Sequence, residues 1–99
     1  MTKTKGVQQE AMKSSVVTVN SECGLHARPA SMLVSTAMKF SSNILIRKKD
    51  RTANCKSILS VLSIGASKGD ELEIVIDGQD EADAFDTIKA LFDFHLAKA

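Results

Sequence analysis

The sequence predicts an α+β fold in which a four-stranded antiparallel sheet is covered on one face by three helices. Apolar residues follow a two-residue period in some segments and a three-to-four-residue period in others. These segments give the order strand, helix, strand, strand, helix, strand, helix. Each predicted strand has only one apolar face, which is typical of an antiparallel sheet with its helices on a single side.

Length and composition indicate one domain. The 99 residues are enough for one modest core, and residues 1–14 show neither apolar period, so a flexible polar tail is expected before a folded domain over residues 15–99. A formal net charge of +1, with no aromatic residues interleaved among basic ones, argues against nucleic acid as a partner. No apolar block has the length of a signal peptide or membrane span, so we expect a cytoplasmic protein without membrane insertion.

The first half of the domain begins with a strand over residues 15–20, which are rich in β-branched side chains and end at a turn-prone run. Residues 27–39 form the next element, a helix with one buried stripe. That stripe contains Ala30, Leu33, Val34, Ala37 and Met38. Residues 43–48 and 51–54 are then predicted to be two strands joined by a tight turn at Lys49 and Asp50.

The second half supplies the remaining helix, strand and helix. Residues 58–64 are short and apolar and are closed by Gly65, which predicts a short helix. Residues 71–77 alternate between apolar and polar side chains, as a half-buried strand does. Asp80 can cap the last helix. The apolar face of that helix is supplied by Phe85, Ile88, Leu91 and Phe92.

The segment GLHARPAS, residues 24–31, places a histidine and an arginine at a helix start. If the helix begins at Ala27, then His26 is its N-cap residue. Pro29 then lies in the first turn, where its missing N–H breaks no hydrogen bond. Gly24 allows the preceding loop to adopt backbone angles that other residues resist, so a partner or a phosphoryl group can come close.

The helix start favours an anion because its first N–H groups carry the positive end of the helix dipole. We expect those groups to be the amides of Ala27, Arg28 and Ala30. A cation is disfavoured there, so the His26 ring is expected to be neutral and therefore nucleophilic. A phosphoryl group on that ring would lie among the amides and near the Arg28 guanidinium. Local physics leaves open the alternative that His26 is only a surface or capping residue.

The octet resembles the active-site signature of the HPr family, the histidine-containing phosphocarriers of the bacterial phosphoenolpyruvate-dependent sugar phosphotransferase system. The resemblance covers Val16 to about Leu96 and implies an open-faced sandwich fold. It implies that His26 accepts a phosphoryl group from enzyme I, which is charged by phosphoenolpyruvate, and passes it to the EIIA component of a sugar permease. Arg28 would stabilise the phosphohistidine. We expect no cofactor and a monomer.

Ser57 stands directly before the predicted 58–64 helix, so one interpretation of its role is a plain N-cap. The resemblance implies a second one, because in many members of the family the matching serine is phosphorylated by an ATP-dependent serine kinase. That modification weakens transfer at the histidine and creates a binding face for a transcriptional regulator. A phosphate at Ser57 is compatible with the positive helix end, and its charge would repel acidic docking partners.

The apolar side chains of the 58–64 helix do not share a single face, so some of them are expected to stay exposed and mark an interface. Val61 is expected in the core instead. The resemblance implies a shared docking face for enzyme I and EIIA. Its residues are Ala27, Arg28, Ser31, Ile58, Leu59 and Leu62.

Three other functions stay open. One is a nitrogen-branch carrier that relays phosphate to a regulatory EIIA, and another is a regulatory binding module that acts through the Ser57 face. A free-standing hydrolase with His26 as general base lacks an orienting carboxylate in the local sequence. Cys23 and Cys55 are expected to be free thiols, and the single Cys-x-x-His pair predicts no metal site.

Overall fold

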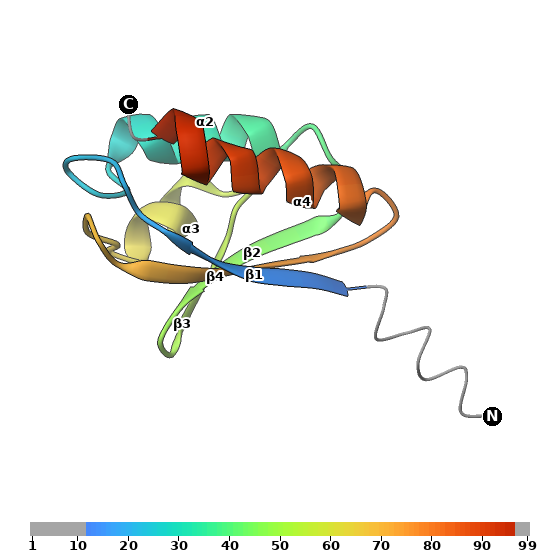
Figure 1. The fold of residues 1–99 in the computed structure, drawn as a ribbon, viewed down its shortest axis with the longest axis horizontal. Coiled ribbons are helices and arrows are strands. Elements are labelled where there is room, and N and C mark those ends of the chain that lie inside the picture. The colour runs from blue at the N-terminus through green and yellow to red at the C-terminus, as the bar shows by residue number, and fades with distance from the viewer. Residues whose placement is uncertain (1–11, 97–99) are drawn as a thin grey trace.

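The computed structural model describes residues 12–96, which form one antiparallel sheet with the helices on one side (Figure 1). The predicted α+β sandwich is confirmed, and the strand order across the sheet is β1-β4-β2-β3. The elements are β1 (Met12–Thr18), α2 (Ala27–Ala37), β2 (Asn43–Lys48), β3 (Arg51–Asn54), α3 (Ile58–Ser63), β4 (Glu71–Asp77), α4 (Glu81–Ala90) and the π-helical segment η1 (Leu91–His95). No helix within residues 12–96 is both long and apolar enough to cross a bilayer.

The core lies between the helices and the inner face of the sheet. On β4, Leu72, Ile74 and Ile76 are all buried, and the register places Ile46 of β2 opposite Ile74 and Ile44 opposite Ile76. The predicted alternation of β4 is therefore confirmed. The helices complete this core with further buried apolar side chains, among them Leu33, Val61, Ile88 and Phe92.

Strand β1 begins earlier than predicted and also ends earlier. Residues 12–14, assigned to the polar tail on their side chains, pair with Asp77, Ile76 and Val75 of β4. β1 includes these residues because their backbone pairs with the seven-residue strand β4, although their side chains show no apolar period. The strand stops at Thr18 rather than residue 20. The rest of the predicted tail, residues 1–11, lies outside the described residues.

Two helices end sooner than their apolar pattern predicts. α2 stops at Ala37, and the chain tightens so that the Lys39 N–H donates to the Thr36 carbonyl oxygen at 3.1 Å. Met38 is 63% exposed, so its predicted place in the buried stripe is wrong. α3 stops at Ser63, and Ile64, just beyond the helix, turns into the core.

Asp80 lies at the N-cap position of α4, but its side chain makes no capping hydrogen bond there. Its carboxylate instead accepts hydrogen bonds from the Ser42 hydroxyl and from the N–H groups of Ser41 and Ser42, each N–H at 2.9 Å. These bonds, the Ser42 hydroxyl first, lower the pKa of Asp80 from 3.8 to about 2. The prediction that the Asp80 side chain caps α4 is therefore wrong, because the loop after α2 offers this carboxylate more donors.

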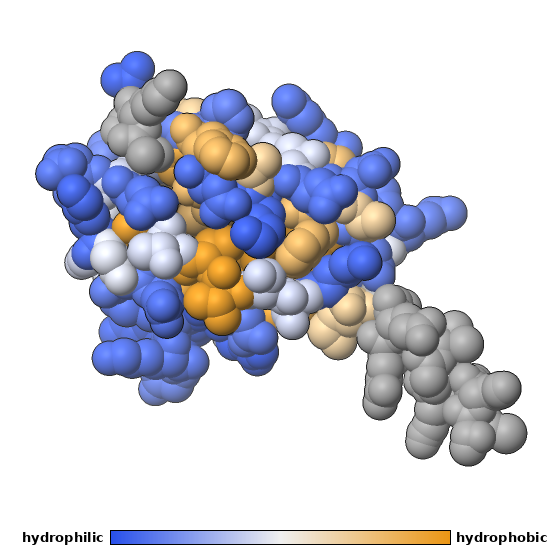
Figure 2. All heavy atoms as spheres, in the orientation of Figure 1, coloured by the Kyte–Doolittle hydropathy of each residue, from blue (hydrophilic) through white to orange (hydrophobic). Residues whose placement is uncertain are grey.

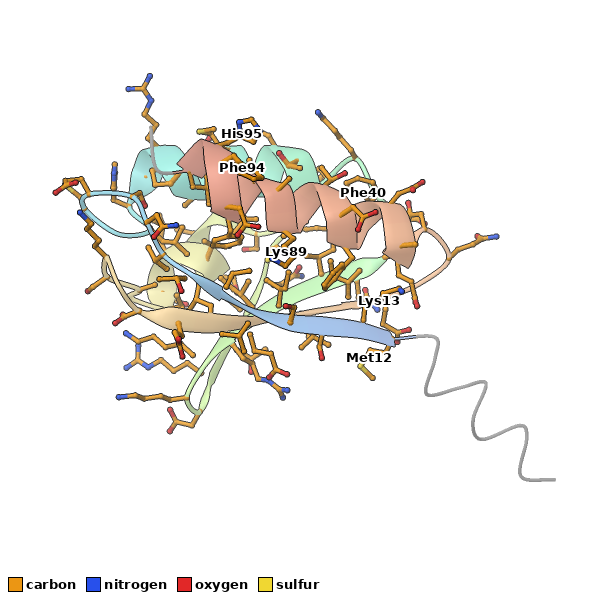
Figure 3. All side chains as sticks on the ribbon, in the orientation of Figure 1. Met12, Lys13, Phe40, Lys89, Phe94 and His95 are labelled. Carbon is orange, nitrogen blue, oxygen red and sulfur yellow. The ribbon has the colours of Figure 1, made fainter. Side chains whose placement is uncertain are left out.

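The last helix continues from α4 through η1. Ile88, Leu91 and Phe92 are buried as predicted, while Phe85 is only half-buried. Phe94 projects outward from η1 (Figure 3). Elsewhere on this side of the molecule, hydrophobic residues reach the surface between α4 and β1, with hydrophilic residues around them (Figure 2).

Candidate functional site

The start of α2 is the first part of the site. The helix begins at Ala27 as predicted, and His26 occupies the N-cap with an extended backbone, φ −88° and ψ −165°. The His26 side chain makes no capping hydrogen bond and is half-buried. A ring nitrogen is thus held at the helix end without an intramolecular bond to the cap, which leaves it available to an incoming group.

Fewer amides are available beside His26 than the sequence suggests. The Ala30 N–H donates to the His26 carbonyl oxygen at 3.0 Å, because that carbonyl is the first acceptor inside the helix. The prediction that Ala30 supplies an open donor is therefore wrong. Among residues 12–96, the N–H groups of Ala27 and Arg28 have no acceptor, and Pro29 has no N–H to offer.

Arg28 supplies the positive charge at this helix end. Its side chain is exposed and forms no salt bridge to another described residue. Ala27 and Ser31 are exposed as well. These three residues thus offer a cation, a small apolar group and a hydroxyl on the outer side of the first turns of α2.

The loop before His26 is built tightly against the loop after α3. The buried Ser21 hydroxyl donates to the Gly24 carbonyl oxygen at 2.8 Å, and Gly24 has φ +76°. A Cβ on Gly24 would lie 2.3 Å from the Ala66 carbonyl oxygen. The group that comes close to this glycine is therefore the protein's own backbone, rather than the external partner predicted from the sequence. The Leu25 N–H then donates to the same Ala66 oxygen at 3.0 Å.

Ser57 is the N-cap of α3, as its position predicts. Its hydroxyl oxygen accepts a hydrogen bond from the Ser60 N–H at 3.3 Å, and the residue is half-buried. The turn that precedes α3 is held by another hydrogen bond, which the Lys56 N–H donates to the Asn54 side-chain oxygen at 2.9 Å. The Lys56 ammonium donates to the Phe40 carbonyl oxygen at 2.6 Å and so joins the turn to the end of α2.

The short helix α3 presents apolar side chains to solvent. Leu59 is 76% exposed, and Ile58 and Leu62 are also exposed, while Val61 is fully buried. The expectation that only part of this helix faces the core is confirmed. Because α3 packs beside α2, these apolar side chains and those at the start of α2 lie on neighbouring helices (Figure 1).

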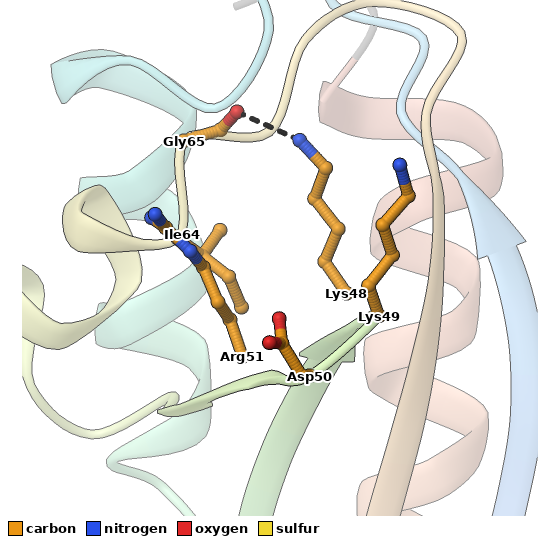
Figure 4. Close-up of a pocket in the computed structure, with 6 residues that line it drawn as sticks. All are labelled: Lys48, Lys49, Asp50, Arg51, Ile64 and Gly65. Atoms are coloured by element: carbon orange, nitrogen blue, oxygen red, sulfur yellow. Dashed lines mark hydrogen bonds between the residues drawn. The ribbon is translucent and has the colours of Figure 1, made fainter.

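A surface pocket beside the β2–β3 turn gathers Lys48, Lys49 and Arg51 around Ile64 and Gly65 (Figure 4). Two of these cations already have acceptors, since the Lys48 ammonium donates to the Gly65 carbonyl oxygen and the Arg51 guanidinium to that of Ser63, each at 3.1 Å. The negative end of α3 explains this gathering of cations. We therefore assign the pocket to helix capping.

An open-faced sandwich with an unbonded imidazole and open amides at a helix start has the features that a small phosphoryl carrier requires. The family described as the PTS HPr component phosphorylation site matches residues 13–93. The phosphocarrier protein HPr of Lysinibacillus sphaericus is 40% identical over 80 residues, which are 81% of this chain and 91% of that protein. The chain therefore belongs to the HPr family and is a phosphocarrier of the phosphotransferase system.

Solved structures of the family agree with this assignment. An HPr structure from Thermoanaerobacter tengcongensis superposes with a TM-score of 0.83 at 34% identity and covers 88% of this chain and 98% of that one. An HPr structure from Bacillus anthracis gives a TM-score of 0.79 at 34% identity, over 83% and 98% of the two chains. The expected open-faced sandwich is thus confirmed against experimental relatives.

Proposed function

We propose that His26 is the residue that carries the phosphoryl group, and that the protein works as a cytoplasmic monomer between enzyme I and EIIA components of sugar permeases. The observation that carries this proposal is the N-cap position of His26, where the ring has no capping hydrogen bond. The other candidate ring, His95, lies in η1 at the far end of the chain. His95 stands in the last turn of that segment, where the negative end of a helix favours a cation over an anion.

The transfer step at His26 forms one bond as another breaks. A neutral ring nitrogen attacks the phosphorus atom carried by enzyme I, and the donor's bond to phosphorus breaks as the new N–P bond forms. The amides of Ala27 and Arg28 and the Arg28 guanidinium lie at the end of the helix that favours the resulting dianion. Transfer to EIIA reverses this exchange.

The docking face of the proposal combines the starts of α2 and α3. Exposed apolar area at the centre and a charged group at the edge are typical of protein interfaces. The residues we propose for contact with enzyme I and EIIA are Ala27, Arg28, Ser31, Ile58, Leu59 and Leu62, all of them exposed. The burial of Val61 in the same helix keeps α3 fixed while its outer side chains bind.

Phosphorylation of Ser57 is the regulatory part of the proposal, with an ATP-dependent serine kinase as its source and a transcriptional regulator as a second partner. The half-buried hydroxyl lies at the start of α3, beside the exposed Ile58 and Leu59. A phosphate there places negative charge within the docking face without opposing the helix dipole. Binding of acidic partners would therefore weaken while the fold stays intact.

The test of His26 uses enzyme I, phosphoenolpyruvate and magnesium, followed by intact mass and acid lability. We expect one acid-labile phosphoryl group on the wild type and on His95→Ala, and none on His26→Ala. His95→Ala is the matched control because these are the only two histidines in the sequence. A phosphoryl adduct that survives in His26→Ala would overturn the assignment.

Arg28→Ala should fold normally and transfer the phosphoryl group more slowly. An unchanged rate would show that Arg28 takes no part in the transfer step.

The branch and the regulation need separate experiments. Transfer from the phosphorylated carrier to a purified sugar-permease EIIA and to a nitrogen-branch EIIA would separate the two kinds of carrier, and we expect the sugar acceptor to react faster.

Ser57→Asp should weaken binding to enzyme I, whereas Ser63→Asp, which adds the same charge at the other end of α3, should not. Equal affinity of wild type and Ser57→Asp would contradict the regulatory proposal.

A further inference from the structure

Two loops meet beneath His26 and are held together by backbone hydrogen bonds. We call residues 19–26 the active-site loop and residues 65–70 the support loop. At one end of the contact, the Val19 N–H donates to the Asp70 carbonyl oxygen at 2.9 Å and the Gly69 N–H to that of Val19 at 2.8 Å. At the other end, the Leu25 N–H donates to the Ala66 oxygen at 3.0 Å. The position of the support loop therefore sets the position of the residue before His26.

One side chain from β2 fastens both ends of the support loop. The Lys48 ammonium donates to the Gly65 carbonyl oxygen at 3.1 Å and lies 2.9 Å from a carboxylate oxygen of Asp70 (Figure 4 shows the first of these bonds). The same Asp70 oxygen accepts the Ser67 N–H at 2.8 Å. Lys48 and Asp70 thus close the support loop across its whole length.

The Lys48–Asp70 ion pair, which joins β2 to the support loop, is less exposed than the ion pair that joins the two loops to each other. The Lys48 and Asp70 side chains are only 24% and 31% exposed, and the Ser67 N–H and then Lys48 lower the pKa of Asp70. Lys68 and Glu22 also pair across the two loops, at 3.1 Å, but their side chains are 53% and 82% exposed. Exposed pairs of that kind contribute little. The lower exposure of its side chains therefore singles out the Lys48–Asp70 pair.

We propose that Lys48 and Asp70 are positioning residues for phosphoryl transfer at His26, acting through the support loop and the Leu25–Ala66 hydrogen bond. The inference rests on the proposed role of His26. Without the ion pair, the Gly65 and Asp70 ends of the support loop are no longer tied together, and the Ala66 oxygen can move away from Leu25. A reacting group displaced by even a fraction of an ångström transfers more slowly.

The variant Lys48→Met removes the ammonium group and keeps an unbranched side chain only one atom shorter. Asp70→Asn removes the negative charge of the other partner. Arg47→Met is the matched control, because Arg47 is the neighbouring residue of β2 and makes an ion pair of the same 2.9 Å length with Glu73. Arg47 and Glu73 face away from the helices, and the hydrogen bonds of the Arg47 side chain go to Glu73 rather than to either loop. Lys48→Arg keeps the charge and is the conservative rescue.

Two measurements test the proposal. The first is the single-turnover rate of phosphoryl transfer from phosphorylated enzyme I. It should fall about fivefold to tenfold in Lys48→Met and Asp70→Asn, which corresponds to about 1–1.4 kcal/mol, the net contribution of one ordinary hydrogen bond. Arg47→Met and Lys48→Arg should stay within about twofold of the wild type. The second is amide hydrogen exchange at Leu25, which should speed up in the first two variants while Ile46 and Ile74 in the sheet keep their protection.

The outcomes separate this inference from the proposed function. If the wild type takes no phosphoryl group on His26, the proposed function fails, and the Leu25 exchange rates still report whether the ion pair holds the loops. If the wild type is phosphorylated but Lys48→Met transfers and exchanges like Arg47→Met, the positioning role is overturned. Faster Leu25 exchange with an unchanged transfer rate would also overturn it, because the loop contact would then not control His26.

Discussion

Replacing Gly24 by alanine tests the idea that the active-site loop is held by backbone contact with the support loop. Gly24 has φ +76°, and its added Cβ would lie 2.3 Å from the Ala66 oxygen and 2.9 Å from the Ser67 Cα. Neither of these atoms belongs to a flexible side chain. Gly24→Ala therefore has to push the two loops apart, whereas Gly65→Ala, with a similar φ of +66°, meets no atom within 4 Å.

The expected cost follows from the two effects. A side chain in the left-handed region costs about 1–2 kcal/mol, and both variants pay that amount. Separation of the loops at Gly24 also breaks the hydrogen bond between the Leu25 N–H and the Ala66 oxygen, which adds about 0.5–1.5 kcal/mol, with further strain where the loops cannot move far enough. We expect Gly24→Ala to lower the free energy of unfolding by about 2–4 kcal/mol and Gly65→Ala by about 1–2 kcal/mol.

Urea unfolding of the two variants and the wild type, followed by circular dichroism, measures this difference. The comparison requires a common slope of the unfolding free energy against urea, because a changed slope would mean a changed unfolded state. If Gly24→Ala proves no less stable than Gly65→Ala, the contact between Gly24 and Ala66 does not constrain the loop, and the reasoning that places His26 through the support loop is wrong.

Three further predictions concern other parts of the molecule. Asp80 has a pKa of about 2 against an ordinary 3.8, so its contribution to stability is complete above the ordinary value and is lost as the pH falls through the folded one. Asp80→Asn should flatten the pH dependence of unfolding in that window, and an unchanged acid limb would contradict this. A thiol reagent at neutral pH should modify exposed Cys23 in the native protein, while Cys55, whose pKa burial raises to about 12, should react only after unfolding. Leu59→Ser should leave the free energy of unfolding within about 0.5 kcal/mol yet weaken binding to enzyme I, as measured by calorimetry.

The element types could be predicted because they depend on neighbours in the chain. The start of α2 at Ala27 follows from Pro29 in the first turn, and the buried side of β4 follows from its alternation. The N-cap role of Ser57 follows in the same way from its place before an apolar helix. In each of these cases the deciding hydrogen bond or face lies within a few residues.

Predictions failed where a distant segment offered better partners or where a helix ended before its apolar pattern did. Asp80 has the side chain of an N-cap, but the Ser41 and Ser42 donors come from 38 or 39 residues earlier in the chain. Met38 has the right spacing for the core, but α2 ends before it. Likewise, nothing in the local sequence connects Lys48 with Asp70, since the end of β2 and the support loop meet only in the folded chain.

The sequence by itself determined the kinds of elements, the helix start at His26 and the chemistry available there, because hydrogen bonding and apolar period within a helix or strand are local. Only the tertiary structure decided the strand order, the early start of β1 and the backbone contact beneath Gly24. These features depend on which atoms become neighbours when the chain closes on itself. Whether a buried donor finds an acceptor, or two backbone segments come close, is decided by the folding of the whole chain and not by the residues on either side.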